Sequence, residues 1–516
     1  MIELNDRFLR QRGLIDQNRV EQLNVLVSGS PEAVSDLVVL LSQLGIGQGS
    51  GSISLIKPSK SPKSIFWDLS FPKIESWEDW KNADSPRRKI VSVSEISSLS
   101  KFDYHISLNS SEAFTNVNLY GYATGPRGKI SRSFLGGFSE KNLHVLSPSM
   151  RIVVASTMLQ QMLQDIDGLS RMKISGAWFT ISCRVESTDL EEVRKYVSGV
   201  DGTLVDVQLT SDGNATLARY RPRNQPKLNV FDFLFQTKVI SQFELSVSED
   251  VGLISWDEPA HAYDETWQLN TTGIVVLGAG GLGSWCAPLL VGKLNNGTLH
   301  IVDGDPEIEV HNLNRQVLYN LKHLGLEKAS IASSRLQKLN PNINVKPYCE
   351  YLTANNLYQI VEDDDDFDEL GLGPSMLFEA LKSSELYLAC LDNMVARTNL
   401  NQAAIKNEAL MVNGATEAMH GVVETFGKHG CMVCRYGEVS ARSTEVISCT
   451  EEGIRPIASI VTSTAWVGSM MAIMAMVNLR DDHRMENLRS TWFEGQIEYH
   501  MPSQPPWYEE HCKYHI

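Results

Sequence analysis

The sequence predicts an α/β protein in which a Rossmann-like unit, a parallel sheet with flanking helices, occurs twice. The apolar run Ile274–Leu277 indicates a buried strand, and closely spaced glycines follow it, as at a strand-to-helix turn. A degraded copy of this pattern occupies Leu23–Lys57. With 516 residues, of which 42% are apolar, the chain is long enough for about three domains.

A glycine-rich loop follows the strand Ile274–Leu277. Its glycines are Gly278, Gly280, Gly281 and Gly283. Backbone N–H groups at the start of the next helix suit a phosphate, and glycines let the backbone approach it closely. Dinucleotide dehydrogenases share the pattern and place an acid about 20 residues further on to hold the ribose. Asp303 meets that spacing too, so the loop alone does not separate the two kinds of site.

The segment Asn312–Gln316, which reads Asn-Leu-Asn-Arg-Gln, favours ATP chemistry. A nicotinamide site needs no fixed cation beside its phosphates. Nucleophilic attack on the α-phosphate of ATP builds negative charge on the phosphate oxygens and on the departing pyrophosphate, which Arg, Lys and Mg²⁺ can stabilise. Arg315 and Lys328 are the candidate cations. The combination predicts ATP-dependent activation of a carboxylate.

Together these motifs resemble the ThiF/MoeB and ubiquitin-activating enzyme superfamily, whose adenylation domain carries a GxGGxG loop, a DxD strand end and an NLxRQ motif. The DxD element is Asp303-Gly-Asp305, and Ala389–Arg397 is similar to the family's strand-end Asp-Asn followed by an Arg. The resemblance implies that Asp303 holds the ribose and Asp392 holds Mg²⁺. It also implies that the ATP phosphates lie against Asn312, Arg315, Gln316 and Lys328, beside the glycine loop.

The first copy lacks the residues that bind a nucleotide. Ser30, Pro31, Glu32 and Ala33 stand where the second copy has glycines, and its second strand ends in Lys57 instead of an acid. Close approach to a phosphate is therefore blocked and the ribose acceptor is missing. We expect this copy not to bind ATP.

A short element before the first strand, Arg7–Gln11, resembles the RxxRQ element of this family. In homodimeric relatives the second arginine of that element reaches the ATP of the neighbouring subunit. The resemblance implies an intramolecular pseudo-dimer, in which the inactive half supplies Arg10 to the active half. The alternative is that Arg10 is an ordinary surface arginine.

The two copies divide the chain into three expected domains. An inactive ThiF-like domain is expected over residues 1–170 and an active one over 261–516. Between them, residues 171–260 predict a small α+β insert, with strands at Phe179–Val185 and Thr203–Leu209 and a helical run between them at Asp189–Val197. The apolar stretch Ile460–Leu479 contains several polar residues and is expected to be a buried helix, not a membrane span.

Four residues have the spacing of a structural zinc site. Cys431 and Cys434 form a C-x2-C pair, and Cys512 with His515 forms a C-x2-H pair at the end of the chain. Thiolate and imidazole ligands suit tetrahedral Zn²⁺. His515 departs from the family's commoner set of four cysteines. Redox or incidental cysteines are the alternative.

Cys449 lies between the C-x2-C pair and the apolar helix, a position that resembles the crossover-loop cysteine of relatives. There the cysteine accepts the activated acyl group as a thioester or persulfide. An acyl adenylate is a strong electrophile, so a loop thiolate could convert it into a transferable thioester. The alternative is a buried cysteine that packs as a small hydrophobe.

Charge, the N-terminus and the cysteine spacing indicate the kind of partner and the cell compartment to expect. A formal net charge of −16 argues against nucleic acid as the main partner, because phosphate contacts need clustered Lys and Arg. The N-terminus lacks the apolar core of a signal peptide and the cysteines lack dense regular spacing, so a cytoplasmic protein without a membrane partner is expected.

The expected function is that of an activating enzyme. It would use MgATP to adenylate the C-terminal carboxylate of a small ubiquitin-like protein, form a thioester on Cys449, and pass the acyl group to a conjugating partner. Two alternatives remain open. One is adenylation of a ribosomal precursor peptide without a thioester, as in microcin-like pathways. The other is a non-catalytic protein that binds a modifier or a peptide, although the joint presence of Asp303, Arg315, Lys328 and Asp392 argues against it.

Overall fold

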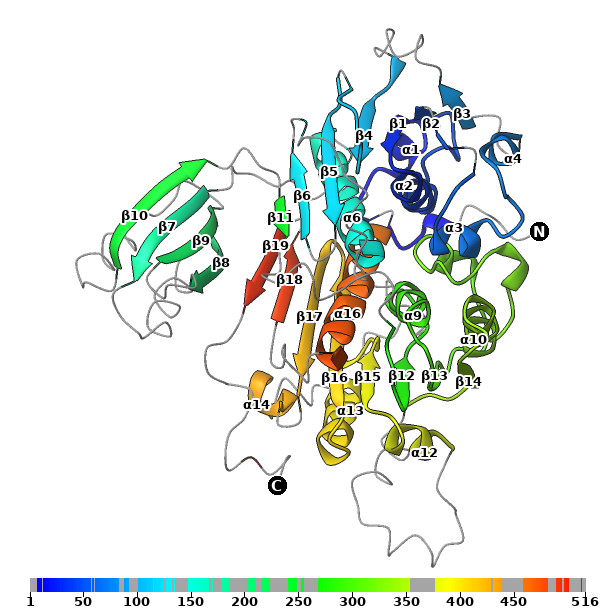
Figure 1. The fold of residues 1–516 in the computed structure, drawn as a ribbon, viewed down its shortest axis with the longest axis vertical. Helices are drawn as coiled ribbons and strands as arrows, with labels where there is room; N and C mark the ends of the chain where they lie inside the picture. Colours follow the sequence, from blue (N-terminus) through cyan, green and yellow to red (C-terminus); the bar gives the residue numbers. More distant parts are fainter. Residues whose placement is uncertain are drawn as a thin grey trace, which may run out of the picture.

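The computed structural model of the chain contains three sheets, two of which share the same order of strands (Figure 1). With short gaps, it describes residues 7–82, 88–91, 101–134, 147–169, 268–352, 376–438 and 458–480. It also describes the strands within residues 179–254 and 489–500, and Cys512.

The first sheet has the order β11-β6-β5-β4-β1-β2-β3. Its strands are β1 (Asn24–Gly29), β2 (Ser52–Ile56), β3 (Arg88–Val91), β4 (Tyr104–Leu108), β5 (Leu119–Thr124), β6 (Arg127–Ser131) and β11 (Gly252–Ile254). The strands β3, β2, β1, β4 and β5 run parallel, whereas β6 and β11 pair antiparallel. All residues of β2 and β4 are buried, as expected of parallel strands covered on both faces.

The second sheet has the order β14-β13-β12-β15-β16-β17-β18-β19. Its strands are β12 (Gly273–Leu277), β13 (Thr298–Val302), β14 (Asn344–Tyr348), β15 (Leu386–Ala389), β16 (Leu410–Glu417), β17 (His420–Phe426), β18 (Arg489–Phe493) and β19 (Gln496–His500). Its first five strands are parallel and the rest antiparallel. The two sheets therefore repeat one arrangement, and both are Rossmann-like, as the sequence predicts.

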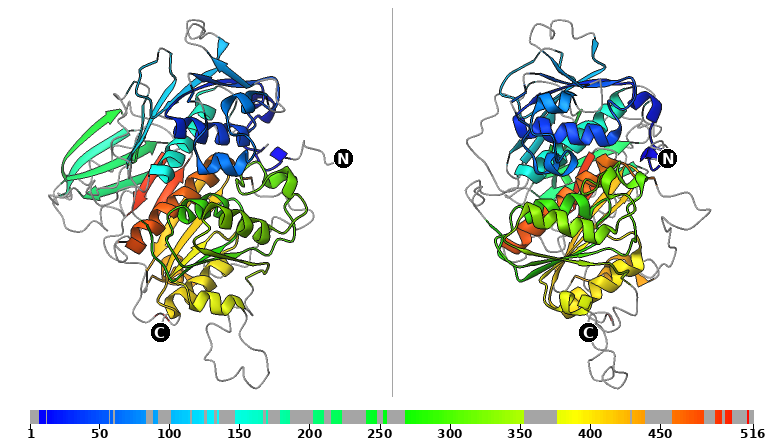
Figure 2. Two further views of the ribbon diagram at one scale, coloured as in Figure 1. Left: turned by 45° about the vertical axis from the view of Figure 1, so that its right-hand side comes forward. Right: turned by 90° about the vertical axis from the view of Figure 1, so that its right-hand side faces the viewer.

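The helices lie mainly in two groups, one beside each of these sheets (Figure 2). Those of the first half are α1 (Gln17–Val20), α2 (Pro31–Leu44), α3 (Ile65–Ser70), α4 (Trp77–Asn82) and α6 (Ser147–Asp165). Those of the second half are α9 (Gly283–Val291), α10 (Lys328–Leu339), α12 (Met376–Lys382), α13 (Met394–Lys406), α14 (Met432–Tyr436) and α16 (Val461–Arg480), with the 3-10 turns η3 (Val310–Asn312) and η4 (Leu321–His323).

The two halves share a continuous apolar core, because α6 packs against α16. Gln160 on α6 accepts a hydrogen bond from the Thr462 hydroxyl at 2.8 Å, and the Phe66 ring packs against Trp285 in a tilted arrangement with ring centroids 4.7 Å apart. The segment Val461–Leu479 of α16 is long and apolar enough to cross a membrane. That segment is, however, fully buried within the protein. The helix is therefore a core element, as expected.

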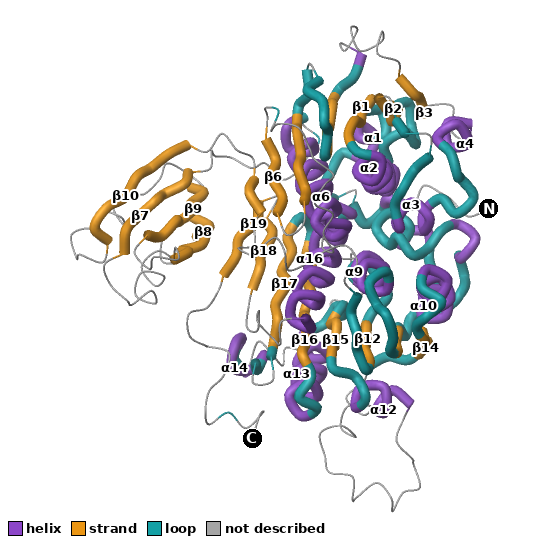
Figure 3. Tube along the Cα trace, in the orientation of Figure 1, coloured by secondary structure: helices purple, strands orange, loops and turns teal. Residues whose placement is uncertain are grey.

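The third sheet, drawn beside β18 and β19, has the order β10-β7-β9-β8 and is antiparallel throughout (Figure 3). Its strands are β7 (Phe179–Val185), β8 (Gly202–Leu209), β9 (Ala215–Pro222) and β10 (Ile240–Val247). Both predicted strands of the insert are present, and the predicted helical run lies outside the described residues. The chain then returns to the first sheet as β11, so this sheet is inserted within the first half.

Candidate functional site

The glycine loop makes a tight turn between β12 and α9. Gly278 has a φ of +95°, and a Cβ there would lie 2.4 Å from the carbonyl oxygen of Cys390 at the end of the neighbouring strand. A Cβ on Gly283 would lie 2.1 Å from the Gly278 oxygen. At Gly280 the nearest atom would be 3.6 Å away. Gly278 and Gly283 are thus required by the backbone packing of the turn, whereas the space beside Gly280 is open.

The start of α9 presents backbone N–H groups without a side-chain cap, since Leu282 at its N-cap makes no capping hydrogen bond. In the first half the start of the corresponding helix, α2, is capped. The Ser30 hydroxyl accepts the hydrogen bond of the Ala33 N–H, and Pro31 has no N–H to offer. The start of α9 therefore lacks the side-chain cap and the proline that occupy the start of α2, which favours α9 as the place for an anion.

Asp303 stands directly beyond β13, against the glycine loop. One of its carboxylate oxygens accepts the Ala279 N–H at 2.7 Å, and the other accepts the Asp305 N–H at 3.0 Å. Burial raises the pKa of the Asp303 carboxyl above its ordinary value, and the positive charge of Lys328 opposes part of that rise. The carboxylate lies at the edge where a ribose meets a Rossmann sheet.

Lys328, the first residue of α10, forms an ion pair with Asp305. The Tyr351 hydroxyl donates to the other Asp305 oxygen at 3.1 Å, and the Tyr351 ring lies against Gly304. Nearby acids, among them Asp392, add to burial in raising the pKa of the Tyr351 phenol. Asp303, Asp305 and Asp392 therefore lie around one tyrosine at the carboxyl edge of the sheet.

The motif Asn312–Gln316 is buried beside the glycine loop. Arg315 donates to the His311 carbonyl at 2.7 Å and to the Asn314 side chain at 2.9 Å. The Asn312 side chain accepts the Glu309 N–H at 3.0 Å, which caps η3. Among the described residues, the buried Gln316 Oε1 has no hydrogen-bond partner. The motif is fixed by its own backbone contacts and packs toward Gly280 and Gly281.

Arg10 comes from the first half and lies against this motif. Its guanidinium Nη2 is 3.4 Å from the His311 Nε2, and only 4% of the residue is exposed. The Asn314 side chain donates to Gln11 at 3.3 Å, and the Ser459 N–H donates to the Arg10 carbonyl at 2.9 Å. Arg10 is thus a buried residue at the contact between the halves, not an ordinary surface arginine.

Positive charge gathers around His311. Burial is the main cause that lowers the pKa of the His311 imidazole to about 3, and the charges of Arg10, Arg315 and Lys328 lower it further. Three cations from three separate segments therefore act on one partly buried ring beside the start of α9. Neither His311 nor Tyr351 was predicted from the sequence as a site residue. His311 adjoins the motif directly, and this adjacency was the available signal.

Asp392 follows β15 and is exposed, next to Asn393, which caps α13 by accepting the Ala396 N–H at 2.7 Å. Arg397 is buried beneath this turn. It donates to the carbonyl of Leu391 and to the carbonyl of Gly414, the latter at 2.6 Å. Burial lowers the pKa of the Arg397 guanidinium. The hydrogen bond from the buried Arg397 to the Leu391 carbonyl therefore fixes the backbone next to Asp392.

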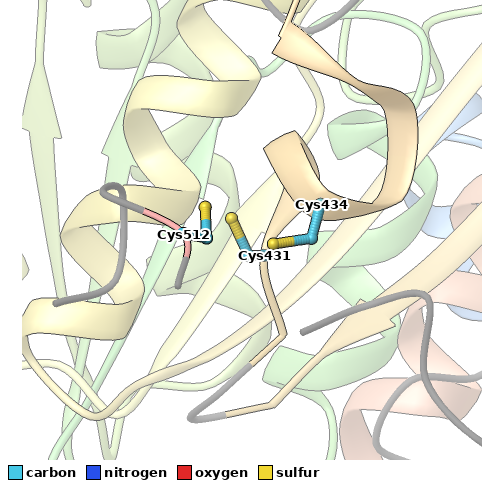
Figure 4. Close-up of side chains that lie close together, drawn as sticks. All are labelled: Cys431, Cys434 and Cys512. Carbon is cyan, nitrogen blue, oxygen red and sulfur yellow. The ribbon is translucent and has the colours of Figure 1, made fainter. Parts of the chain in front are cut away.

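Three of the four residues predicted to bind zinc lie together (Figure 4). The sulfur atoms of Cys431, Cys434 and Cys512 are all within 4.8 Å of one another, although Cys512 comes 78 positions after Cys434 in the sequence. Three converging thiols fit the donor set of a tetrahedral zinc site. The fourth predicted ligand, His515, and the predicted nucleophile, Cys449, lie outside the described residues.

These features define a Rossmann-like α/β protein with an open glycine loop, strand-end acids and buried cations at one sheet edge. The chain belongs to the ThiF family, whose model matches residues 258–505. It is 32% identical over 216 residues to a sulfur carrier protein adenylyltransferase of Thermus thermophilus, a match that covers 40% of this chain and 69% of that protein.

In two other relatives the match covers a smaller share of the relative's own length. The adenylyltransferase and sulfurtransferase UBA4 of Meyerozyma guilliermondii is 32% identical over 205 residues, which is 39% of this chain and 42% of that protein. The UBA4 protein of Candida glabrata is 28% identical, over 43% of this chain and 45% of that protein. The chain thus spans less than half the length of these two relatives. A crystal structure of E. coli MccB with ATP aligns at 19% identity and a TM-score of 0.35, over 48% of this chain and 66% of that one.

Proposed function

We propose that the chain is an ATP-dependent adenylyltransferase that activates the C-terminal carboxylate of a small carrier protein. One observation carries the proposal: Arg10, Arg315 and Lys328 act together on His311 beside the uncapped start of α9. Buried cations next to open backbone N–H groups suit a triphosphate whose α-phosphorus is under attack. The names of the relatives support the same reaction class.

In this proposal the nucleotide lies over the glycine loop, with its ribose at Asp303 and its phosphates toward Gln316 and the three cations. A carboxylate oxygen of the substrate attacks the α-phosphorus, the bond to pyrophosphate breaks, and an acyl adenylate forms. The cations stabilise the charge on the phosphate oxygens and on pyrophosphate. Mg²⁺ would be held at Asp392 and would neutralise phosphate charge.

We further propose that the two halves form a pseudo-dimer within one chain. The closed start of α2 supports an inactive first half, and the position of Arg10 supports its role as an arginine supplied to the second half. The expected segments 1–170, 171–260 and 261–516 remain our proposal, with the refinement that β11 returns to the first sheet at residue 252. The Cys431, Cys434 and Cys512 thiols would hold a structural Zn²⁺ with His515.

The carrier is proposed to be a ubiquitin-like or sulfur-carrier protein, because several relatives bear sulfur-transfer names. After adenylation, the Cys449 thiolate would attack the acyl carbon, expel AMP and form a thioester for transfer to a partner protein. Adenylation of a precursor peptide would need no such cysteine.

The test is ATP–pyrophosphate exchange with small proteins and with peptides that have a free C-terminal carboxylate, followed by non-reducing gels. Exchange with a protein and a thiol-labile adduct that Cys449→Ala abolishes would support the whole proposal. Exchange with peptides and no adduct would shift the substrate to a precursor peptide. Asp392→Ala should abolish exchange, while Cys449→Ala should preserve it. No exchange with any candidate, together with no binding of MgATP, would contradict the proposal.

A further inference from the structure

We propose that Tyr319 is a positioning residue that directs the backbone N–H of Gly280 toward a phosphate group of the nucleotide. The inference rests on the proposed function, because it requires a nucleotide to lie over the glycine loop. Tyr319 acts through one buried hydrogen bond, which its hydroxyl donates to the Ala279 carbonyl oxygen at 2.8 Å.

Two side chains fix the backbone on either side of Ala279. The Ala279 N–H donates to Asp303 at 2.7 Å, and the Ala279 carbonyl accepts from Tyr319. The peptide bond between Ala279 and Gly280 is trans, so its C=O and its N–H point in opposite directions. Because the carbonyl is directed at the Tyr319 hydroxyl, the Gly280 N–H is directed away from it. The hydroxyl therefore sets the direction of a donor to which it is not bonded.

The Gly280 N–H is available to an anion. Among the described residues, no hydrogen bond from this N–H is found. A Cβ on Gly280 would have the side-chain nitrogen of Gln316 as its nearest neighbour, at 3.6 Å, so the space beside Gly280 is open and is bordered by a second donor. Donors beside open space at a helix start suit a phosphate.

Gly280 itself makes this peptide easy to turn over, so its direction depends on the hydrogen bond. Rotation of the peptide changes φ at Gly280, and no side chain opposes that change. A turned peptide would present the Ala279 carbonyl oxygen to the phosphate and would repel it. Within the part of the chain that the structure describes, Tyr319 is the one donor found for that oxygen. The hydroxyl therefore favours the orientation that binds an anion.

The surroundings of Tyr319 suit this role. Only 4% of the residue is exposed. A second carbonyl, that of Lys328, lies 3.3 Å from the hydroxyl, so the Ala279 oxygen is the nearer acceptor for its single hydrogen. Burial, with the charges of Asp303 and Asp305, raises the pKa of the Tyr319 phenol well above its ordinary value. The hydroxyl therefore keeps its hydrogen near neutral pH.

The first half supports the importance of the Gly280 N–H. Gly29 ends β1, and Gly278 directly follows β12, the corresponding strand of the second sheet. Two positions further on, Pro31 stands where the second half has Gly280. Proline has no N–H. The half expected not to bind ATP thus lacks the donor that Tyr319 directs in the other half.

The test is Tyr319→Phe, which keeps the ring and removes the hydroxyl. MgATP is titrated into the full chain by calorimetry, without acyl substrate, and adenosine binding is followed by ligand-observed NMR. The Kd for MgATP should rise by about 10-fold or more, because a donor to a charged phosphate is lost. The Kd for adenosine should stay unchanged, because adenosine has no phosphate. A merely structural role of the hydroxyl would weaken the binding of both ligands alike.

Tyr387→Phe is the matched control. Tyr387 is fully buried near the start of β15, and its hydroxyl also donates to a backbone carbonyl, that of Leu381 at 2.7 Å. This variant loses a buried hydrogen bond of the same kind away from the glycine loop. It should leave the Kd values for MgATP and adenosine unchanged.

A second measurement uses the unaltered chain labelled with ¹⁵N-glycine, so it does not depend on the folding of Tyr319→Phe. The amide resonance that Gly280→Ala removes belongs to Gly280. It should shift much further with MgATP than with adenosine.

Four results would each overturn the inference. They are an unchanged Kd for MgATP in Tyr319→Phe, equal losses of MgATP and adenosine binding in that variant, an equal loss of MgATP binding in Tyr387→Phe, and a Gly280 resonance that bound MgATP does not shift. Absence of MgATP binding to the unaltered chain would instead overturn the proposed function, and the role of Tyr319 with it.

Discussion

Gly29 and Gly278 occupy equivalent positions in the two halves, each at the end of the central strand of its sheet. Both have positive φ, +142° and +95°. A Cβ on Gly29 would lie 1.8 Å from the Leu108 oxygen, and one on Gly278 would lie 2.4 Å from the Cys390 oxygen. Leu108 and Cys390 themselves end or follow equivalent neighbouring strands, β4 and β15. The first half thus has a glycine at this position although Ser30 caps the helix that follows it.

Gly278→Ala and Gly280→Ala should therefore differ: the first should lower stability, and the second should weaken nucleotide binding. The first places a Cβ against backbone at a positive φ and should lower the free energy of unfolding by about 1–3 kcal/mol. The second has room for its methyl group and should leave the stability of the chain nearly unchanged, while the added methyl hinders a phosphate. Denaturant unfolding and MgATP binding would separate them. Equal loss of stability in both variants would contradict this assignment.

Arg10→Ala should reduce the rate of ATP–pyrophosphate exchange by about 10³-fold, as expected for an arginine that stabilises phosphoryl charge. The effect should fall on kcat more than on the KM for ATP. Arg19→Ala, which removes an exposed arginine from the same half, is the control and should have little effect. A loss confined to KM would indicate that Arg10 serves only to bind the nucleotide.

Zinc content can be measured directly in the purified chain, where about one zinc ion per chain is expected. Cys434→Ser should lower the zinc content and the thermal midpoint together, because it removes one of three converging thiols. Cys349→Ser removes an exposed thiol elsewhere and should change neither quantity. A metal-free wild-type chain with full stability would rule out a structural zinc site.

Tyr436→Phe tests a buried network that joins α14 to the turn with Asp392. The Tyr436 hydroxyl donates to Glu424, which also accepts from Asn413 at 3.2 Å, and Asn413 accepts from Arg397. Loss of the hydroxyl removes one partner from a fully buried carboxylate and should cost about 1–3 kcal/mol of stability. Tyr351→Phe, at an exposed position, should cost much less. Similar losses in both variants would argue against the network.

Stability should decrease as the pH falls from about 6.5 toward 4. Burial lowers the pKa of the His105 imidazole to about 4, and burial with the Lys346 charge does the same for His300. The unfolded chain binds protons at these rings near pH 6.5, so it binds more protons than the folded chain in this window, and stability rises with pH there. Denaturant midpoints at pH 7 and pH 5 would measure the slope. His105→Gln should flatten it, and an unchanged slope would show that His105 does not contribute.

Much of the fold could be predicted from local patterns. The run Ile274–Leu277 and the glycines after it identify a strand-to-helix turn. A buried parallel strand needs a continuous apolar run, and a positive φ favours glycine, so both can be recognised in a sequence. The contact between Arg10 and His311 could not be predicted, since the two residues are 301 positions apart and only the packing of the two halves on each other brings them together. Tyr351 was missed for a similar reason: its contact with Asp305 depends on how β14 ends beside β13.

The continuous core that joins the halves also has an evolutionary consequence. A subunit that has lost its own phosphate loop would normally be free to degenerate, and a dimer can exchange or lose such a subunit. Here the side of α16 that packs on α6 lies in the shared apolar core, so loss of the first half would expose that side to solvent. If the first half is inactive, as we propose, selection on it should act on its helix packing and on the residues near Arg10, and less on the loop between β1 and α2.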